Sequence, residues 1–275
     1  MSIRMVVLPL LAFASFASED ASHPLTAREI MKRVAENQDR EQNARTQFVY
    51  EENVHRTMRR KDGKLLREEY RTFSVTPGVK GTEKKLQSVK GRYWKKGHYV
   101  AFKGEPVPEP GLFSITFDDD GDSQTKDGVD KDLFPLTSDE QKNYEFELAG
   151  ERVFEGRPAY RIQFRPPNRK DYGWTGEALI DKEELQPVSV YTRLSRRLPL
   201  AVRTALGTDV PGLGFTVSYT RLDKDLWFPS SYGTEFGVHA LFLFNRTFTE
   251  SLENKNFRRA SVESRVKFGD GPATH

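Results

Sequence analysis

The sequence predicts a mainly β domain of the α+β class, in which antiparallel strands are accompanied by a few helices. Most segments after Arg45 alternate apolar and polar residues with a period of two, as in Tyr160–Phe164, and this pattern is typical of strands with one buried face. Turn signals such as Asp62–Gly63 and Glu155–Gly156 separate these segments. Aromatic residues make up 12% of the chain, which also favours β structure.

The first 17 residues have the features of a secretory signal peptide. Arg4 precedes an apolar stretch that is too short to span a bilayer, and Ser15 and Ala17 supply small residues at its end. We expect cleavage after Ala17, which leaves residues 18–275 as a single periplasmic domain without a lipid anchor. The alternative is that the apolar stretch is a buried N-terminal helix or strand.

A helix with a clear start follows the expected cleavage site. Thr26 and Glu29 have the spacing of a capping box, in which each side chain binds the backbone of the other residue. Ile30, Met31 and Val34 then form a narrow apolar stripe, so we expect the helix to lie against another element. We expect it to end near residue 43.

A β-hairpin with one apolar face is predicted over residues 172–194. The polar link from Asp181 to Gln186 cannot continue either arm, and Pro187 suits the first position of the returning strand because it lacks an N–H group. Alternation assigns one face of the two arms to Trp174, Ala178, Ile180, Val188, Val190 and Leu194.

This hairpin resembles a known superfamily. Its Trp-x-Gly-x-x-x-Ile-Asp arm, short acidic turn and Pro-Val-x-Val return are similar to the lipoprotein-sorting superfamily, which includes LolA, LolB, LppX-type proteins and the lipoprotein-binding half of RseB/MucB. The resemblance extends in weaker form over residues 26–268. It implies a strongly curved antiparallel sheet that forms an unclosed barrel, helices that cover the open side, and acyl chains held between them. The implied ligand is a lipid or an acylated lipoprotein.

The resemblance also implies which residues line the cavity. The hairpin and the strand Phe215–Tyr219 would form its wall, and the N-terminal helix and an expected helix over residues 198–206 would close it. For that second helix, completion of the core is an equal alternative to a lid. All the candidate ligand-binding residues could instead form a packed core without a cavity. They are Ile30, Met31, Val34, Trp174, Ala178, Ile180, Val188, Val190, Leu194, Leu198, Val202, Phe215, Val217 and Tyr219.

LolA-like carriers use an arginine on an early strand to control ligand release, and Arg45 lies in the comparable region.

The segment from residue 80 to 102 is basic and contains aromatic residues. This composition suits single-stranded nucleic acid, but a strand pair with a solvated basic face is the favoured interpretation, and attraction to anionic lipid headgroups lies between the two. The whole chain has a net charge of only +3, from 43 basic and 40 acidic residues, so we expect no nucleic-acid partner. Peripheral contact with a membrane is compatible with this pattern.

An acidic insertion between residues 104 and 139 interrupts the strands. Asp118, Asp120 and Asp122 have the spacing of a calcium loop, but Ser123 and Val129 stand where glycine and a bidentate glutamate are required. We therefore expect a solvated acidic loop and no metal site.

The sequence lacks the motifs of catalysis. The chain has no cysteine, its five histidines are scattered, and it contains no serine elbow, Walker loop or zinc-protease motif. A mean hydropathy of −0.68 argues against an integral membrane protein. We expect a carrier that is not an enzyme and needs no cofactor. The alternatives are an RseB-like sensor that signals to an envelope membrane protein, and an enzyme whose side chains converge only in the fold.

Overall fold

The computed structural model describes most of the chain. The ranges are 24–78, 81–104, 122–123, 135–168, 173–196, 213–223, 226–240 and 244–260. The expected signal peptide, the expected helix over residues 198–206 and most of the acidic insertion lie outside the described residues.

The described elements are two helices and twelve strands. The helices are α1 (Ala27–Arg45) and α3 (Ser138–Gln141). The strands of the N-terminal part are β1 (Phe48–Arg60), β2 (Leu65–Thr76), β3 (Thr82–Lys95), β4 (His98–Lys103) and β5 (Asp122–Ser123). The remaining strands are β6 (Glu145–Phe154), β7 (Arg157–Arg165), β8 (Trp174–Asp181), β9 (Pro187–Leu194), β10 (Gly214–Asp223), β11 (Leu226–Ala240) and β12 (Phe244–Arg259).

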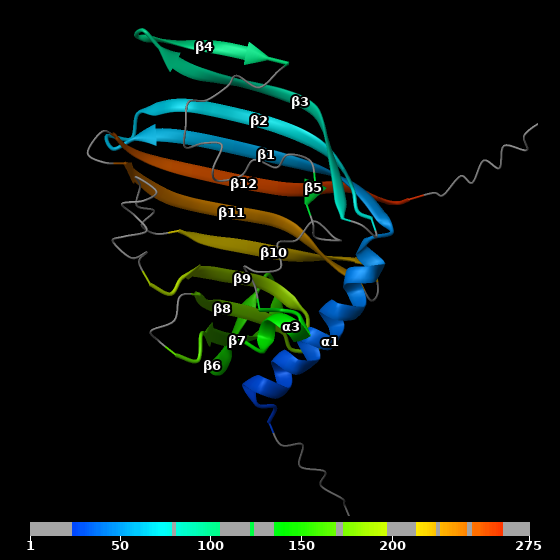
Figure 1. Cartoon of the computed structure of the whole chain (residues 1–275). Coiled ribbons are helices and arrows are strands. Elements are labelled where there is room, and N and C mark those ends of the chain that lie inside the picture. The colour runs from blue at the N-terminus through cyan, green and yellow to red at the C-terminus, as the bar shows by residue number, and fades with distance from the viewer. Residues whose placement is uncertain are drawn as a thin grey trace, which may run out of the picture.

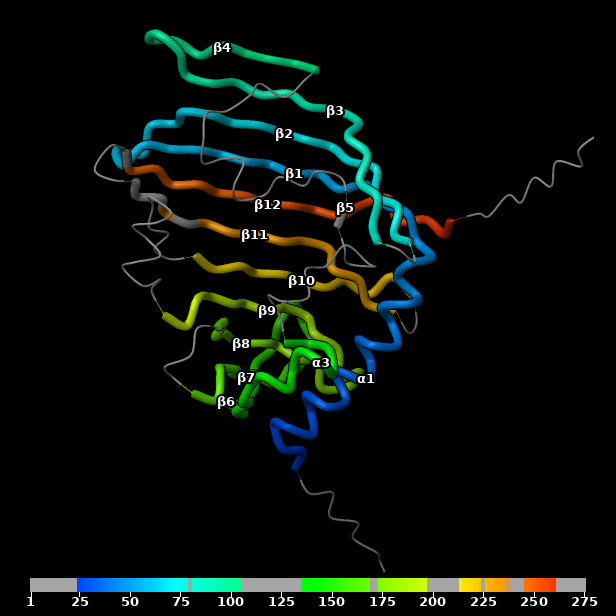
Figure 2. The backbone as a smooth tube through the Cα atoms, in the orientation of Figure 1, coloured from blue at the N-terminus to red at the C-terminus, as the bar shows by residue number. Residues whose placement is uncertain are grey.

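All the strands belong to one antiparallel sheet. Its order is β4-β3-β2-β1-β12-β11-β10-β9-β8-β7-β6, and β5 pairs with β3 beside this path. Two meanders therefore meet where the first strand, β1, pairs with the last, β12. The edge strands β4 and β6 lie at opposite ends of the sheet and do not pair with each other in the described part of the chain (Figures 1 and 2). The prediction of a mainly β fold with an unclosed sheet is confirmed.

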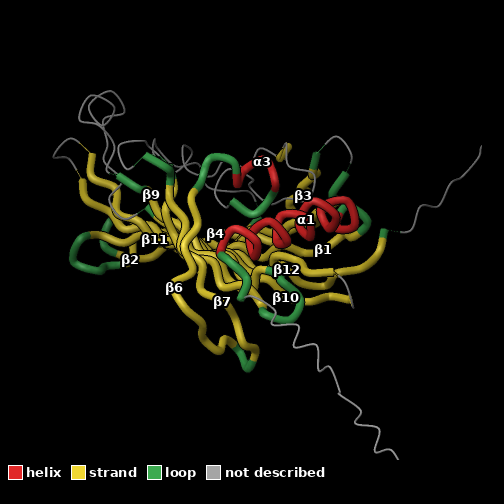
Figure 3. The backbone as a smooth tube through the Cα atoms, turned by 90° about the horizontal axis from the view of Figure 1, so that it is seen from below, coloured by secondary structure: helices red, strands yellow, loops and turns green. Residues whose placement is uncertain are grey.

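The helices lie on one side of the sheet. Helix α1 runs across the strands, with α3 beside it (Figure 3). Its apolar side chains form one cluster with side chains of β7, β8, β9 and β10. We call this side of the sheet the inner face, and the opposite side the outer face.

The predicted hairpin is present as β8 and β9. Ala178 pairs with Val190, and the polar residues 182–186 form the turn between the strands. The end of β8 is buried on both faces, however, because Leu179 and Asp181 are only 5% and 1% exposed. The period-two pattern therefore located the strand but underestimated the burial of its outer face.

The end of the first helix differs from the prediction. Helix α1 continues to Arg45, two residues beyond its expected end, and Thr46 is its C-terminal cap.

Candidate functional site

Helix α1 is positioned over the inner face by its capping box and its apolar stripe. The Oγ1 atom of Thr26 accepts a hydrogen bond from the backbone N–H group of Glu29, and the Glu29 carboxylate accepts one from the backbone N–H group of Thr26. The side chains of Ile30, Met31 and Val34 are completely buried. The helix therefore contributes three large apolar side chains to the space between itself and the sheet.

The sheet offers an apolar surface beneath these side chains. Each of the four strands from β7 to β10 contributes buried residues that join α1 in one hydrophobic cluster. We call this surface the apolar half of the inner face. Its strand residues include Ile162, Phe164, Ala178, Ile180, Val188, Val190, Phe215, Val217 and Tyr219.

The structure places ten of the fourteen candidate ligand-binding residues in this single cluster. Trp174 is partly buried and packs against the cluster, with its ring centroid 5.3 Å from that of Phe215. Leu194 is half-buried at the end of β9. Leu198 and Val202 lie outside the described residues. The ten clustered residues are Ile30, Met31, Val34, Ala178, Ile180, Val188, Val190, Phe215, Val217 and Tyr219.

The inner face changes character along the sheet. Residues paired directly across strands lie on the same face, so a row of paired residues samples one face of the whole sheet. From β6 to β10 the row through Phe215 consists of aromatic and small residues. Charged residues follow in the same row on β12, β1 and β2. In strand order it contains Phe146, Phe164, Gly176, Thr192, Phe215, Thr234, Glu250, Arg56, Glu69, Gly91 and Phe102.

Glycine stands next to a phenylalanine ring near both ends of this row. A β-carbon at Gly176 would lie 2.7 Å from the ring of Phe164, and one at Gly91 would lie 2.6 Å from the ring of Phe102. Such contacts are shorter than van der Waals distance, so only glycine allows each ring to lie over the neighbouring strand.

The second part of the inner face holds buried ion pairs. Glu250 accepts a hydrogen bond from Arg56, and both side chains are 9% exposed. Glu69 is bound by Arg67, at 2.5 Å, and by Arg71. We call this surface, on β12, β1 and β2, the charged half of the inner face.

Burial and pairing act in opposite directions on Glu69. Burial raises the pKa of its carboxyl group, but the hydrogen bond from Arg67 and the charge of Arg71 outweigh burial, so the pKa is lowered overall. Glu69 is therefore an anion held between two cations.

The turn between β8 and β9 fixes α1 to the sheet. The side-chain amide of Asn37 donates hydrogen bonds to the backbone carbonyl groups of Glu184 and Leu185, at 3.2 and 3.1 Å. The Glu184 carboxylate in turn accepts hydrogen bonds from the indole N–H group of Trp227, at 2.8 Å, and from Arg157, at 2.7 Å. Glu184 thus connects strands β7 and β11 to the turn that holds α1.

A buried polar group continues this connection along α1. Gln38 donates to Gln186 at 2.9 Å, and Gln186 donates to the carboxylate of Glu41. Glu41 also accepts a hydrogen bond from the backbone N–H group of Trp227, at 3.0 Å. Burial raises the pKa of the Glu41 carboxyl group, and the Trp227 hydrogen bond and the charge of Arg45 offset only part of this effect.

Arg45 lies in the last turn of α1, and the structure gives it a positioning role there. It is 3% exposed, and it donates hydrogen bonds to the backbone carbonyl group of Trp227, at 3.1 Å, and to Gln38, at 3.2 Å. It is therefore not on an early strand, where the resemblance placed the arginine that controls ligand release.

Sequence analysis missed these polar contacts, although a signal was present. Gln38, Glu41 and Arg45 follow Ile30 and Val34 at helical spacing, so they continue the same stripe along α1. A polar continuation of an apolar stripe predicts buried polar side chains with specific partners. The partners themselves, in the turn after β8, are far away in the sequence.

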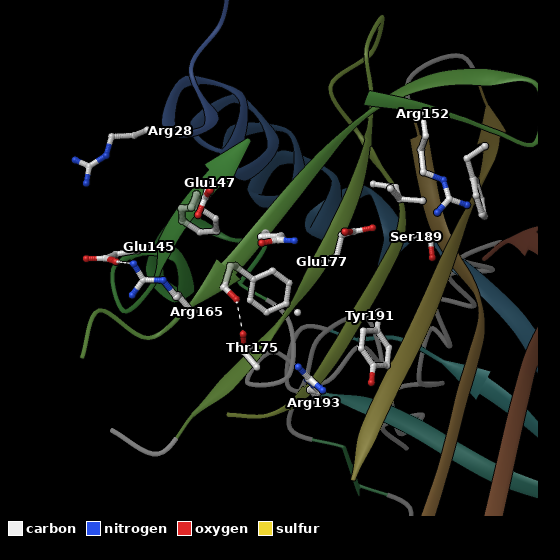
Figure 4. Close-up of a pocket in the computed structure, with 16 residues that line it drawn as sticks. Arg28, Glu145, Glu147, Arg152, Arg165, Thr175, Glu177, Ser189, Tyr191 and Arg193 are labelled. Atoms are coloured by element: carbon white, nitrogen blue, oxygen red, sulfur yellow. Dashed lines mark hydrogen bonds and ion pairs between the residues drawn. The ribbon is translucent and has the colours of Figure 1, made fainter. Parts of the chain in front are cut away.

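A cavity of about 960 Å³ is lined mainly by outer-face residues of β6–β9. Figure 4 shows the charged side chains around it. Glu177 in its wall is paired with Arg161 at 2.8 Å, and Arg165 with Glu145 at 2.6 Å. These ion pairs make the cavity polar, so it does not suit an acyl chain. None of the fourteen candidate residues lines it.

Comparisons with known proteins give weak similarities that cover most of the chain. No family model matches, and no curated protein matches. A DUF1329 family protein from Desulfovibrio piger has a similar structure, at 12% identity and a TM-score of 0.42, over 88% of this chain and 96% of that one. A LolA superfamily protein from Nitrosomonas europaea is similar at 10% identity and a TM-score of 0.33, over 87% and 96%.

The MucA/MucB complex of Pseudomonas aeruginosa also contains a similar chain, at 11% identity and a TM-score of 0.24, over 83% of this chain and 99% of that one. Similar structures thus include members of the superfamily that the hairpin resembles. At these identities and TM-scores they assign neither a ligand nor a partner to this chain. In the described part of the chain, no helix is long and apolar enough to cross a membrane.

Proposed function

We propose that the protein binds an acyl chain of a lipid or of an acylated lipoprotein between α1 and the apolar half of the inner face. In this proposal it carries that ligand through the periplasm and is not an enzyme. One observation supports the site above all: a continuous apolar surface on four neighbouring strands is covered by a helix that contributes only three large apolar side chains.

The free energy of replacing buried α1 side chains with an acyl chain supports binding between α1 and the apolar half of the inner face. Burial of one methylene group contributes about 0.8 kcal/mol, so roughly ten methylene groups of an acyl chain contribute about 8 kcal/mol. Burial of a valine, isoleucine or methionine side chain contributes about 1.5–3 kcal/mol each, which is roughly 5–9 kcal/mol for Ile30, Met31 and Val34 together. An acyl chain can therefore replace the stripe of α1 at little net cost.

The contacts of α1 indicate where the helix moves. Its C-terminal half is held by hydrogen bonds from Asn37, Gln38 and Arg45 to the sheet and to the β8–β9 turn. Its N-terminal half, with Ile30 and Val34, is held by apolar contacts and by one hydrogen bond, from the Gln141 side chain of α3 to the backbone carbonyl group of Met31. Apolar contacts are non-directional and can be exchanged for those of a ligand, so we expect the N-terminal half to lift while the C-terminal half stays in place.

Two matched valine substitutions test the proposal with a fluorescent acyl probe, a dansyl-labelled undecanoic acid. Val34 lies in the cluster beneath α1, and Val75 lies in a second cluster with Tyr50 and Phe228; both valines are completely buried. Val34→Ala removes two methyl groups, and so the volume of about two methylene groups, from the proposed site. We expect it to bind the probe up to about tenfold more tightly than the unchanged protein, because the space left fits the probe.

Val75→Ala is the control, since it makes a similar cavity outside the proposed site. We expect it to bind the probe like the unchanged protein. Equal effects of the two substitutions, or no binding by any of the three proteins, would contradict the acyl site. A stable complex with the soluble domain of an envelope membrane protein, without probe uptake, would favour the sensor alternative.

A further inference from the structure

The outer face of β2–β4 gathers cations and aromatic rings at the end of the sheet opposite to β6. Lys90 pairs with Tyr70 on one side and with Lys103 on the other, and Trp94 pairs with Tyr99. Alternation along β3 places Arg92 on the same face as Lys90 and Trp94. We call this surface the basic corner and define it as Tyr70, Lys90, Arg92, Trp94, Tyr99 and Lys103.

The charge of this region exceeds that of the protein as a whole. Residues 82–103 contain seven lysines and arginines and one glutamate, a net charge of +6, whereas the entire chain has a net charge of +3. Lys90 and Lys103 are exposed, and neither has a carboxylate partner among the residues that the structure describes. Glu68, at the margin of the corner, already binds Arg92 at 2.8 Å. The corner therefore presents uncompensated positive charge to solvent.

Aromatic side chains lie among these charges. Tyr70 is 41% exposed and Tyr99 is 40% exposed, which places both among the exposed large hydrophobic residues of the molecule. Tyrosine and tryptophan prefer the boundary between lipid headgroups and water, and lysine and arginine near that boundary are attracted to anionic lipids. Both requirements of an interfacial contact are met on one surface.

Two of these aromatic rings, those of Trp94 and Tyr70, already have one face covered within the protein, which limits stacking with nucleic-acid bases. The Nζ atom of Lys64 lies 3.4 Å from the centre of the Trp94 ring, and the edge of that ring packs against Tyr99 at 5.0 Å. The ring of Tyr70 is stacked on His55 at 4.3 Å. Binding of single strands depends on free ring faces, whereas a headgroup layer needs only exposed ring edges and cations.

We infer that the basic corner docks the protein on membranes that contain anionic lipids. The corner lies on the outer face of β2–β4, and the proposed acyl site lies on the inner face of β7–β10. Docking therefore does not require a ligand in the acyl site, and either proposal can fail without the other.

Vesicle co-flotation of the purified protein tests this inference. The probes are vesicles of phosphatidylcholine alone and vesicles that also contain phosphatidylglycerol, at low and high salt. We expect binding only to the vesicles with phosphatidylglycerol, and release by salt. The double variant Lys90→Gln/Lys103→Gln loses two cations, each of which contributes about five- to sixfold in affinity, so binding falls by roughly 30-fold.

The matched control is Lys32→Gln/Arg33→Gln, which removes two exposed cations from α1. We expect this control to bind like the unchanged protein, and a melting curve verifies that both double variants are folded. Equal loss in the two double variants would show a general effect of net charge and would overturn the inference. Equal binding to phosphatidylcholine alone, or binding to single-stranded DNA without binding to vesicles, would also overturn it.

Discussion

The two halves of the inner face share one sheet and one register but differ in chemistry. In the apolar half, Ile162, Ala178 and Val190 pack beneath α1. In the charged half, Glu250 and Glu69 occupy positions in the same face and are paired with arginines. The comparison teaches that strand alternation decides which side chains point inward, whereas residue type decides what that inward surface can bind.

The difference restricts where an acyl chain can lie. An alkyl chain is stabilised when it leaves water for apolar surroundings, such as those of Val190 or Val34. It can neither donate nor accept hydrogen bonds, so it cannot replace either partner of the buried pair of Arg56 and Glu250. An acyl chain in the proposed site therefore cannot extend over these buried pairs.

The largest effect is expected in the charged half. Glu69→Ala removes the anion that binds Arg67 and Arg71 and leaves buried positive charge without its partner. We expect the free energy of unfolding to fall by about 3–5 kcal/mol, measured by urea denaturation. A loss below about 1 kcal/mol would mean that this ion pair is solvated like a surface pair.

A comparable truncation in the apolar half is expected to cost somewhat less. Ile162→Ala removes part of a completely buried side chain and leaves a cavity in the cluster beneath α1. We expect a loss of about 3 kcal/mol in the free energy of unfolding. Addition of the acyl probe should restore part of this loss, because a ligand that binds only the folded state stabilises it. Glu69→Ala should show no extra rescue beyond that of the unchanged protein.

The pH dependence of stability should differ in sign between the two buried glutamates. The pKa of Glu69 is lowered from its ordinary value of 4.5, so its stabilising contribution is present above that value and is lost as the pH falls through the folded-state pKa. The pKa of Glu41 is raised, so its contribution is present below 4.5 and is lost as the pH rises through the folded-state pKa.

Glutamine substitutions separate these two contributions in urea denaturation curves at a series of pH values. Relative to the unchanged protein, Glu69→Gln should lose less stability on acidification below 4.5. Glu41→Gln should lose less stability as the pH rises above 4.5. Identical slopes for the variants and the unchanged protein would contradict the assigned pKa directions.

The smallest effect is expected at the start of α1. Thr26→Ala removes the side-chain acceptor for the Glu29 N–H group and half of the capping box. We expect a loss of about 1 kcal/mol in the free energy of unfolding. Because the N-terminal half of α1 is the part expected to lift, this variant should also take up the acyl probe faster in a stopped-flow experiment. An unchanged uptake rate would argue that ligand entry does not involve this end of the helix.

Local sequence signals predicted much of the fold. The capping box of Thr26 and Glu29, the turn at Gly63 and the hairpin of Ala178 and Val190 each depend on residues close in the sequence, and each is confirmed. In these segments propensity, alternation and turn chemistry favour the same conformation, which makes the pattern readable.

The parts that sequence analysis missed depend on contacts between distant residues. The pairing of β1 with β12 joins residues about 200 positions apart, and no local pattern specifies it. The same holds for Glu184, which binds Trp227 and Arg157. Ten of the fourteen candidate ligand-binding residues lie in one cluster, but alternation cannot tell whether that cluster lines a cavity or forms a packed core.

Native mass spectrometry of the protein purified from a bacterial host tests the acyl site most directly, with organic extraction and lipid analysis of any bound species. The account predicts bound masses that correspond to acyl chains, and their occupancy should rise in Val34→Ala and stay unchanged in Val75→Ala. A mass equal to that of the polypeptide alone, with no uptake of added phospholipid or acyl peptide by any of these proteins, would contradict it. In that case the space beneath α1 is closed core, and function resides on the outer surface.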